Sequence, residues 1–285
     1  MKTRTVKHIA KSSHERVGFN FTVRRPLPSA GLKQIDPFLM LDHFGPFYQK
    51  PNEQGGVSEH PHRGFETVTI MLEGQVEHRD SSGGHGTLKA GDVQWMTAGS
   101  GLIHSEMPPD EFRKTGGTVH GIQLWVNLPK RDKMTKPHYQ DISAAQIPVV
   151  KSEDGKSVVR VIAGEAFGVK GAAETHTKVI ALHLMLEPQS RTEIKVPADF
   201  SAFAYIMQGQ ADFENGGMAK ESELALFEND GDGVAVKNAG EETLNMLLLA
   251  GEPIGEPVVS YGPFVMNSPE EIHQAIEDYQ SGRMG

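Results

Sequence analysis

The stretch HPHRGFETVTIMLEGQVEHRD, residues 60–80, decides the expected fold. Its second part contains two apolar runs separated by Glu73-Gly74, a turn signal between two β-strands. The stretch opens with His60 and His62, where a strand would usually carry branched apolar residues. Side chains two residues apart on a strand point to the same face, so both imidazoles are expected on one side of a sheet.

Short strands with turn residues between them continue along the first half of the chain. The segment TLKAGDVQWMTAG (87–99) predicts a strand, a Gly-Asp turn and a second strand. A further strand is predicted in GGTVHGIQLWVNLP (116–129), ending at Pro129. Closely spaced strands of this kind are typical of an antiparallel barrel or sandwich.

The second half repeats this layout. Its matching segments are KVIALHLMLEP (178–188), FSAFAYIMQGQADFENG (200–216), ESELALFENDGDGVAVKNAGEE (221–242) and TLNMLLLAGEP (243–253). The repetition indicates a duplication and predicts two related β-domains. The pattern lapses within residues 137–150, so we place the boundary between residues 142 and 143, giving domains 1–142 and 143–285.

The tail follows a helical pattern instead. Ser268 is a candidate N-cap, followed by Pro269 and by Glu271 three residues after the cap. Apolar residues then recur at helical spacing, at Ile272, Ala275, Ile276 and Tyr279. We expect a short helix at about residues 268–281 that covers a sheet edge or a barrel end.

Composition excludes several classes of function. The chain has no cysteine, which rules out disulfides and thiolate metal sites and fits a cytoplasmic protein. The formal net charge is −9 and no basic stripe is present, so direct nucleic-acid binding is not expected. No apolar run approaches the roughly 20 residues of a membrane span, and the N-terminus lacks the apolar core of a signal peptide, so no membrane association is expected.

A second same-face pair, His104 and Glu106, follows about forty residues after His60 and His62. On neighbouring barrel strands the two pairs could converge on one point. Three imidazoles and a carboxylate suit Fe(II), Mn(II), Ni(II), Cu(II) or Zn(II). Four ligands on a six-coordinate ion would leave two positions for a substrate and dioxygen. One H-x-H pattern alone would carry little weight, but two such pairs predict a metal site.

A candidate catalytic base lies nearby. Glu66 follows His62 by four residues, so a continuous strand would place it on the same face. It is predicted either to act as a base or substrate acceptor, or to orient a ligand histidine. Glu106 is the other candidate base, since it could leave the metal, and the sequence does not separate the two.

The longer strings resemble one family, the pirins, which are two-domain cupins. They are DPFLMLDHFGP (36–46), HPHRGFETVTIMLEGQVEHRDS (60–81), GDVQWMTAGSGLIHSEMP (91–108), GIQLWVNLP (121–129) and GPFVMNSPEEIHQAIEDYQSGRMG (262–285). The resemblance implies two tandem cupin barrels of jelly-roll type. It also implies one metal per chain, usually iron, on His60, His62, His104 and Glu106. The second barrel is expected to be metal-free, and residues 200–242 indeed contain no histidine.

Two functions follow from the resemblance. Bacterial-type pirins resemble quercetin 2,3-dioxygenases, which implies a flavonol and O2 as substrates. Glu106 or Glu66 would take the 3-hydroxyl proton, and the heterocyclic ring would open with loss of carbon monoxide. The alternative is a metal- or redox-dependent regulator, either a transcription cofactor or a modulator of a metabolic enzyme, which would act through a protein partner.

Overall fold

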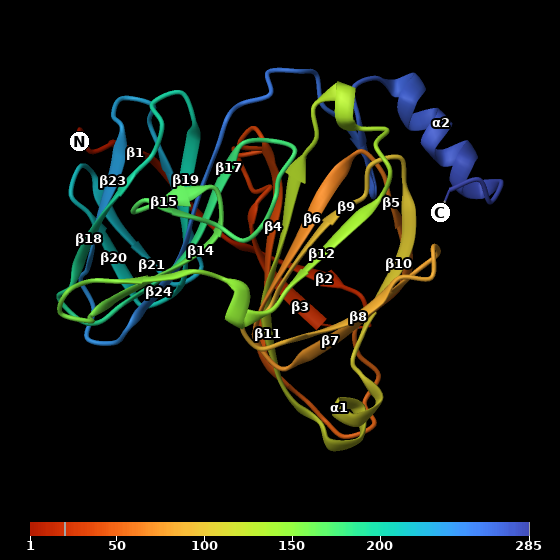
Figure 1. The fold of residues 1–285 in the computed structure, drawn as a ribbon, viewed down its shortest axis with the longest axis horizontal. Coiled ribbons are helices and arrows are strands. Elements are labelled where there is room, and N and C mark those ends of the chain that lie inside the picture. The colour runs from red at the N-terminus through yellow and green to blue at the C-terminus, as the bar shows by residue number, and fades with distance from the viewer. Residues whose placement is uncertain (20, 285) are drawn as a thin grey trace. The chain divides into compact units, whose positions relative to one another are not determined.

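The computed structural model describes residues 1–19 and 21–284. It confirms the all-β prediction, and the described residues divide into two compact units. Unit 1 comprises Met1–Ser13, Arg25–Pro37 and Ala145–Pro253, and unit 2 comprises His14–Arg24, Phe38–Ala144 and Ile254–Gly285. Each unit contains one seven-stranded and one four-stranded antiparallel sheet, which is the two-layer arrangement of a cupin (Figure 1).

Unit 2 contains the histidine-rich half. Its seven-stranded sheet has the order β12-β9-β6-β11-β4-β3-β2, and its four-stranded sheet has the order β5-β10-β7-β8. The strands are β2 (Ser13–Val17), β3 (Phe21–Leu27), β4 (Phe38–Gln49), β5 (Val57–His62), β6 (Phe65–Glu73), β7 (Gln75–Asp80), β8 (His85–Lys89), β9 (Val93–Thr97), β10 (Leu102–Met107), β11 (Gly117–Asn127) and β12 (His138–Ile142). The short helix α1 (Asp110–Thr115) precedes β11, and β3 runs across the boundary between the units.

Unit 1 has the same plan. Its seven-stranded sheet has the order β1-β22-β19-β24-β17-β14-β13, its four-stranded sheet has the order β18-β23-β20-β21, and β15 pairs with β16. The strands are β1 (Val6–Lys11), β13 (Val149–Lys151), β14 (Ser157–Ala163), β15 (Glu165–Ala166), β16 (Val169–Lys170), β17 (Val179–Leu186), β18 (Arg191–Lys195), β19 (Ser201–Gln208), β20 (Gln210–Phe213), β21 (Gly217–Lys220), β22 (Glu223–Phe227), β23 (Gly233–Asn238) and β24 (Leu244–Gly251).

The predicted duplication is visible where the chain passes from one sheet to the other. It crosses from β6 to β7 at Gly74 and from β19 to β20 at Gly209, with φ of 83° and 84°. A Cβ atom on Gly74 would lie 2.4 Å from the carbonyl oxygen of Thr118. Both corners therefore favour glycine, because other residues rarely adopt this backbone conformation.

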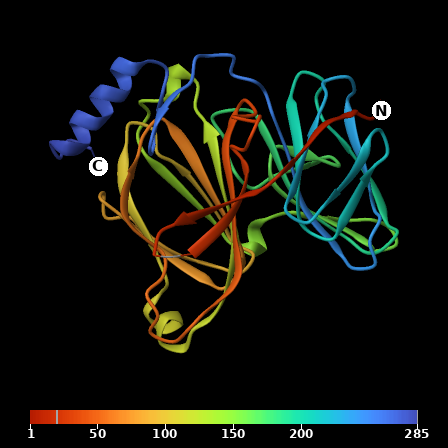
Figure 2. The ribbon, with the colours of Figure 1, turned by 180° about the vertical axis from the view of Figure 1, so that it is seen from behind.

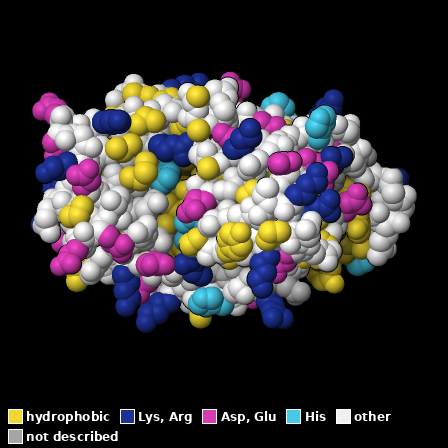
Figure 3. Space-filling model, turned by 90° about the horizontal axis from the view of Figure 1, so that it is seen from below, with side chains coloured by type: hydrophobic (Ala, Val, Ile, Leu, Met, Phe, Trp, Pro, Cys, Tyr) yellow, Lys and Arg dark blue, Asp and Glu magenta, His cyan; other side chains and the backbone are white. Residues whose placement is uncertain are grey.

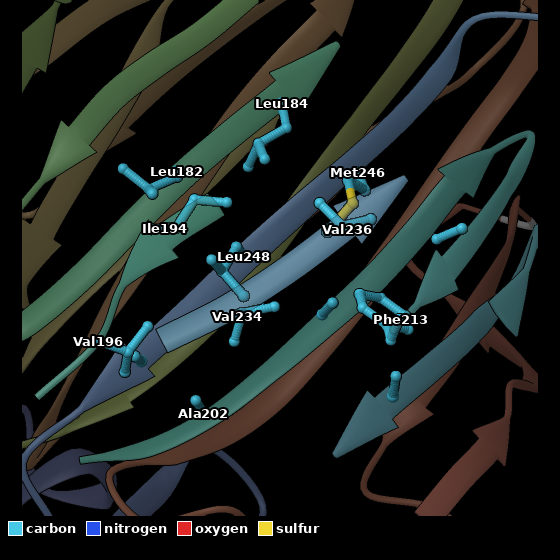
Figure 4. Packing of buried hydrophobic residues seen from close by; sticks show 14 of the residues in the cluster. Leu182, Leu184, Ile194, Val196, Ala202, Phe213, Val234, Val236, Met246 and Leu248 are labelled. Atoms are coloured by element: carbon cyan, nitrogen blue, oxygen red, sulfur yellow. The ribbon is translucent and has the colours of Figure 1, made fainter. Parts of the chain in front are cut away.

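The interior of unit 1 is filled by apolar side chains. Figure 4 shows residues of its two sheets packed against each other, among them Leu182, Ile194, Ala202, Val234 and Leu248. All five are at most 1% exposed. Small and branched apolar side chains fill this barrel, and the absence of a metal from it stays a prediction.

A single boundary after residue 142 would place the N-terminal segment with the histidine-rich barrel and the C-terminal segment with the other barrel. In the structure Met1–Ser13 belongs to unit 1 and Ile254–Gly285 to unit 2. The change of unit at Ala144–Ala145 is close to that boundary, but β1 extends the sheet of unit 1 by pairing with β22. Figure 2 shows this red N-terminal segment beside the blue-green strands. Arg4 anchors it, donating to the carbonyl oxygens of Pro197 and Phe200 at 2.6 and 2.7 Å. The added strand covers an edge that would otherwise present unpaired backbone groups.

The last segment of the chain belongs to unit 2. It contains β25 (Val259–Tyr261), β26 (Phe264–Met266) and α2 (Pro269–Gln280). The predicted N-cap is confirmed, since the Ser268 hydroxyl accepts from the Glu271 amide at 3.3 Å. Ile272 and Ala275 are buried against β26, whereas Tyr279 is 40% exposed.

Among the described residues, neither helix is long and apolar enough to span a bilayer. On the face drawn in Figure 3, acidic and basic side chains are interspersed rather than gathered into a stripe of one sign.

Candidate metal centre

Three histidines come together on the inner face of the four-stranded sheet of unit 2. Strands β5 and β10 are antiparallel neighbours (Figure 1), with His104 directly opposite His60. His62 lies two residues after His60 and on the same face. One ring nitrogen of each histidine lies within 4.8 Å of the others, so the three predicted imidazoles can contact one ion.

Hydrogen bonds fix the ring of His60. Its Nδ1 lies 2.8 Å from the carbonyl oxygen of Ser58. A carbonyl can only accept, so Nδ1 carries the proton and Nε2 keeps a free lone pair. A metal-binding histidine usually has this arrangement, with its second nitrogen bonded to a backbone carbonyl.

His62 and His104 have buried ring nitrogens whose lone pairs could bind a metal ion. Among the described residues no hydrogen-bond partner exists for Nδ1 of His62 or for either ring nitrogen of His104. His62 is 4% and His104 is 1% exposed. A buried imidazole without a partner costs free energy, and a bound cation would remove this cost. These orphaned nitrogens are the structural evidence that the cluster fits a metal ion.

The electrostatics keep the imidazoles in the form that binds metal. Burial lowers the pKa of His62 well below its ordinary value, and the neighbouring His60 lowers it further. Burial and the rings of His62 and His60 also lower the pKa of His104. Both rings are therefore neutral at physiological pH, with a lone pair available for coordination.

The carboxylate of Glu106 is not part of the 4.8 Å group. It follows His104 by two residues on β10 and is held by Gln123, whose Nε2 donates to Oε1 at 3.1 Å. The hydroxyl of Thr69 lies 3.2 Å from the Gln123 amide oxygen and 3.4 Å from Glu106 Oε1. Glu106 therefore lies next to the histidines in a fixed orientation, and its role as fourth ligand stays a prediction.

Gln123 was not identified from the sequence. It lies in the strand GIQLWVNLP, between apolar residues that are buried. A single amide in such a strand is a signal that could have identified Gln123, because a polar group on the inner face of a barrel needs a hydrogen-bond partner.

The prediction that Glu66 shares the face of His62 is wrong. Strand β5 ends at His62, and β6 begins at Phe65 after a turn at Gly64 with φ of 89°. On β6, Phe65 and Thr69 point toward the site, since the Phe65 ring lies 5.1 Å from the His62 ring and Thr69 contacts Glu106. Glu66 alternates with them and faces away, where it accepts a hydrogen bond from Thr97 at 2.7 Å.

Aromatic rings form one wall beside the histidines. The Trp125 ring lies 5.4 Å from His62 and 4.3 Å from Phe65, measured between centroids. The two rings thus close one side of the histidine cluster with apolar surface.

The altered titration of Glu66 gives a test that is independent of the metal. Burial raises the pKa of Glu66 from 4.5 to about 7, although the bond from Thr97 acts in the opposite sense. Between these values the folded chain keeps a proton that the unfolded chain has lost, so rising pH destabilises the fold. Glu66→Gln should therefore increase stability by up to about 3 kcal/mol at about pH 8.5 and change it little near pH 4.

Chemical unfolding of both proteins across this pH range checks the prediction. Glu59→Gln is the matched control, because Glu59 is exposed on β5. An identical pH dependence of stability for wild type and Glu66→Gln would show that Glu66 titrates normally.

The fold and the site define a class, the two-domain cupins with a histidine cluster in one barrel. Residues 20–126 match the family Pirin, and residues 181–285 match the Pirin C-terminal cupin domain. The chain therefore belongs to the pirin family.

Named relatives align over almost the whole chain. Pirin-like protein 2 of Arabidopsis thaliana is 44% identical over 280 residues, which cover 95% of this chain and 82% of that protein. A relative from Pseudomonas aeruginosa, provisionally named a quercetin 2,3-dioxygenase, is 42% identical over 269 residues. The aligned residues cover 94% of this chain and 93% of that protein. The crystal structure of quercetin 2,3-dioxygenase from Acinetobacter baumannii superposes with a TM-score of 0.93 at 38% identity, covering 100% of this chain and 99% of that chain.

Proposed function

We propose that the chain is a metal-dependent dioxygenase of quercetin 2,3-dioxygenase type, which opens the heterocyclic ring of a flavonol with O2. The observation that carries the proposal is the cluster of His60, His62 and His104, in which His62 and His104 are buried and have ring nitrogens without a hydrogen-bond partner among the described residues. The similarity to the Acinetobacter baumannii dioxygenase supports the choice of reaction. We propose Fe(II) as the resident ion, with Ni, Mn, Cu and Zn as the alternatives to be tested.

His60, His62 and His104 would hold the ion, with Glu106 as a fourth ligand that could leave the ion and act as a base. When bound, the ion would polarise the flavonol oxygens and lower the pKa of the 3-hydroxyl group. All further assistance comes from the protein's own side chains.

Glu106 would act as the base that takes the 3-hydroxyl proton. Its carboxylate is oriented by the Gln123 amide at 3.1 Å, so it is held in place before the substrate arrives. Trp125, backed by the buried ring of Phe65, would pack against the flavonol rings and keep water from the reacting carbon atoms. Holding the substrate in this orientation is the main contribution expected of the barrel.

Oxygen uptake with quercetin tests the proposal. The protein is stripped of metal and reloaded separately with Fe(II), Ni(II), Mn(II), Cu(II) or Zn(II). Uptake that depends on one of these ions would support the dioxygenase and name its metal. Protein that binds the ions but consumes no oxygen with any of them would refute it, and would favour the alternative of a metal-dependent regulatory protein.

A further inference from the structure

We propose that the C-terminal segment, residues 254–284, completes the metal centre by orienting His62, with Arg63 and Lys133 as the positioning residues. The inference rests on the proposed metal centre but not on the reaction. This segment follows the second barrel in the sequence and yet lies in unit 2. Its contacts converge on the turn that directly follows His62.

The backbone of β26 lies against this turn. The Arg63 amide donates to the Pro263 carbonyl oxygen at 3.3 Å, and the Val265 amide donates to the Arg63 carbonyl oxygen at 3.0 Å. A Cβ atom on Gly64 would be 2.0 Å from the Val265 carbonyl oxygen. Only glycine allows the two backbones to approach this closely, so the contact fixes the turn in register with β26.

The same Pro263 carbonyl also interacts with the His62 ring as a backbone acceptor. The C-terminal segment thus places a backbone acceptor beside the ring of one ligand. Contacts of this kind to ligand histidines commonly change metal affinity by about 10- to 100-fold.

Lys133 joins the turn to β26 from the interior. Lys133 is 1% exposed, and its ammonium group donates to the carbonyl oxygens of Gly64 and Val265 at 2.7 and 3.0 Å. The third donor bonds to Asn127 Oδ1 at 2.7 Å. All three protons of the ammonium are therefore used, and two of them connect the turn after His62 with the C-terminal segment.

Arg63 joins the turn to α2. Its Nε donates to the Ser100 carbonyl oxygen at 2.6 Å, and its Nη1 donates to Asp278 Oδ2 at 2.8 Å. The Arg63 side chain is 5% exposed, so this ion pair is largely shielded from solvent. Asp278 also binds Arg283, at 3.1 Å, but the Arg283 side chain is 58% exposed. Arg63 is thus the buried partner of Asp278 and Arg283 is the exposed one.

Two substitutions at this carboxylate provide the test. Arg63→Gln removes the buried link and Arg283→Gln removes the exposed one, and the affinity for Fe(II) and Co(II) is measured by chelator competition on the full chain. We expect Arg63→Gln to weaken the metal Kd at least about tenfold and to alter the Co(II) absorption spectrum, with both unchanged in Arg283→Gln. Arg63→Lys should recover part of the affinity, because it keeps the charge but not the paired donors.

Affinity is compared only for variants whose circular dichroism matches the wild type without metal. If Arg63→Gln does not fold, Asp278→Asn removes the same ion pair from the helix side and carries the same expectation. Equal Kd values for wild type and the folded variant would overturn the positioning role alone. Absence of metal binding by the wild type would overturn the metal centre, and this inference with it.

Discussion

His62→Ala should fold normally but bind no metal, and quercetin-dependent oxygen uptake should disappear. Without this imidazole only two of the three clustered nitrogens remain. We therefore expect the metal Kd to rise by more than about 100-fold. The metal-free protein should lose some stability through the cavity left beside Phe65 and Trp125, offset in part because the buried Nδ1 has no partner among the described residues.

Metal content and thermal unfolding check this prediction. Saturating metal stabilises a protein that binds it only when folded, by about 2.7 kcal/mol at a concentration 100 times Kd. Wild type should show this rise in Tm and His62→Ala should not. His85→Ala is the matched control, since His85 is exposed on β8. A full complement of metal in His62→Ala would place the ion elsewhere.

Glu106→Gln should lower turnover by about 100- to 10,000-fold at saturating metal, the range expected for loss of a general base. Glutamine preserves the size of the side chain and can still accept from Gln123, so the site should keep its shape. The amide cannot take the substrate proton. If Glu106 is also the fourth ligand, the metal Kd will rise as well, because a neutral oxygen is a weaker ligand than a carboxylate.

Turnover is therefore measured at several metal concentrations and extrapolated to saturation. Glu59→Gln again serves as the control, because it makes the same chemical change on the neighbouring strand β5 at an exposed position. Wild-type turnover for Glu106→Gln at saturating metal would exclude Glu106 as the base.

The fold was largely predictable because its signals are local. Apolar alternation and glycine corners such as Gly74 mark the strands of both barrels, and the i, i+2 spacing places His60 and His62 on one face. The N-cap at Ser268 identified α2 in the same way. Each of these features depends on a few neighbouring residues.

The errors concern non-local structure. Glu66 was placed on the wrong face because the alternation rule holds only within a continuous strand, and Gly64 interrupts it. Gln123 acquires its meaning only when folding brings it to Glu106. Likewise, no local pattern shows that β1 pairs with β22 or that the C-terminal segment contacts the turn after His62.

The most direct test of the account is to measure oxygen uptake and carbon monoxide release together while the reloaded protein consumes quercetin. We expect equal amounts of oxygen taken up, carbon monoxide released and quercetin lost, with none of the three changes in His62→Ala. Loss of quercetin without carbon monoxide, or the same yield from His62→Ala, would contradict ring-opening dioxygenation at the three-histidine centre.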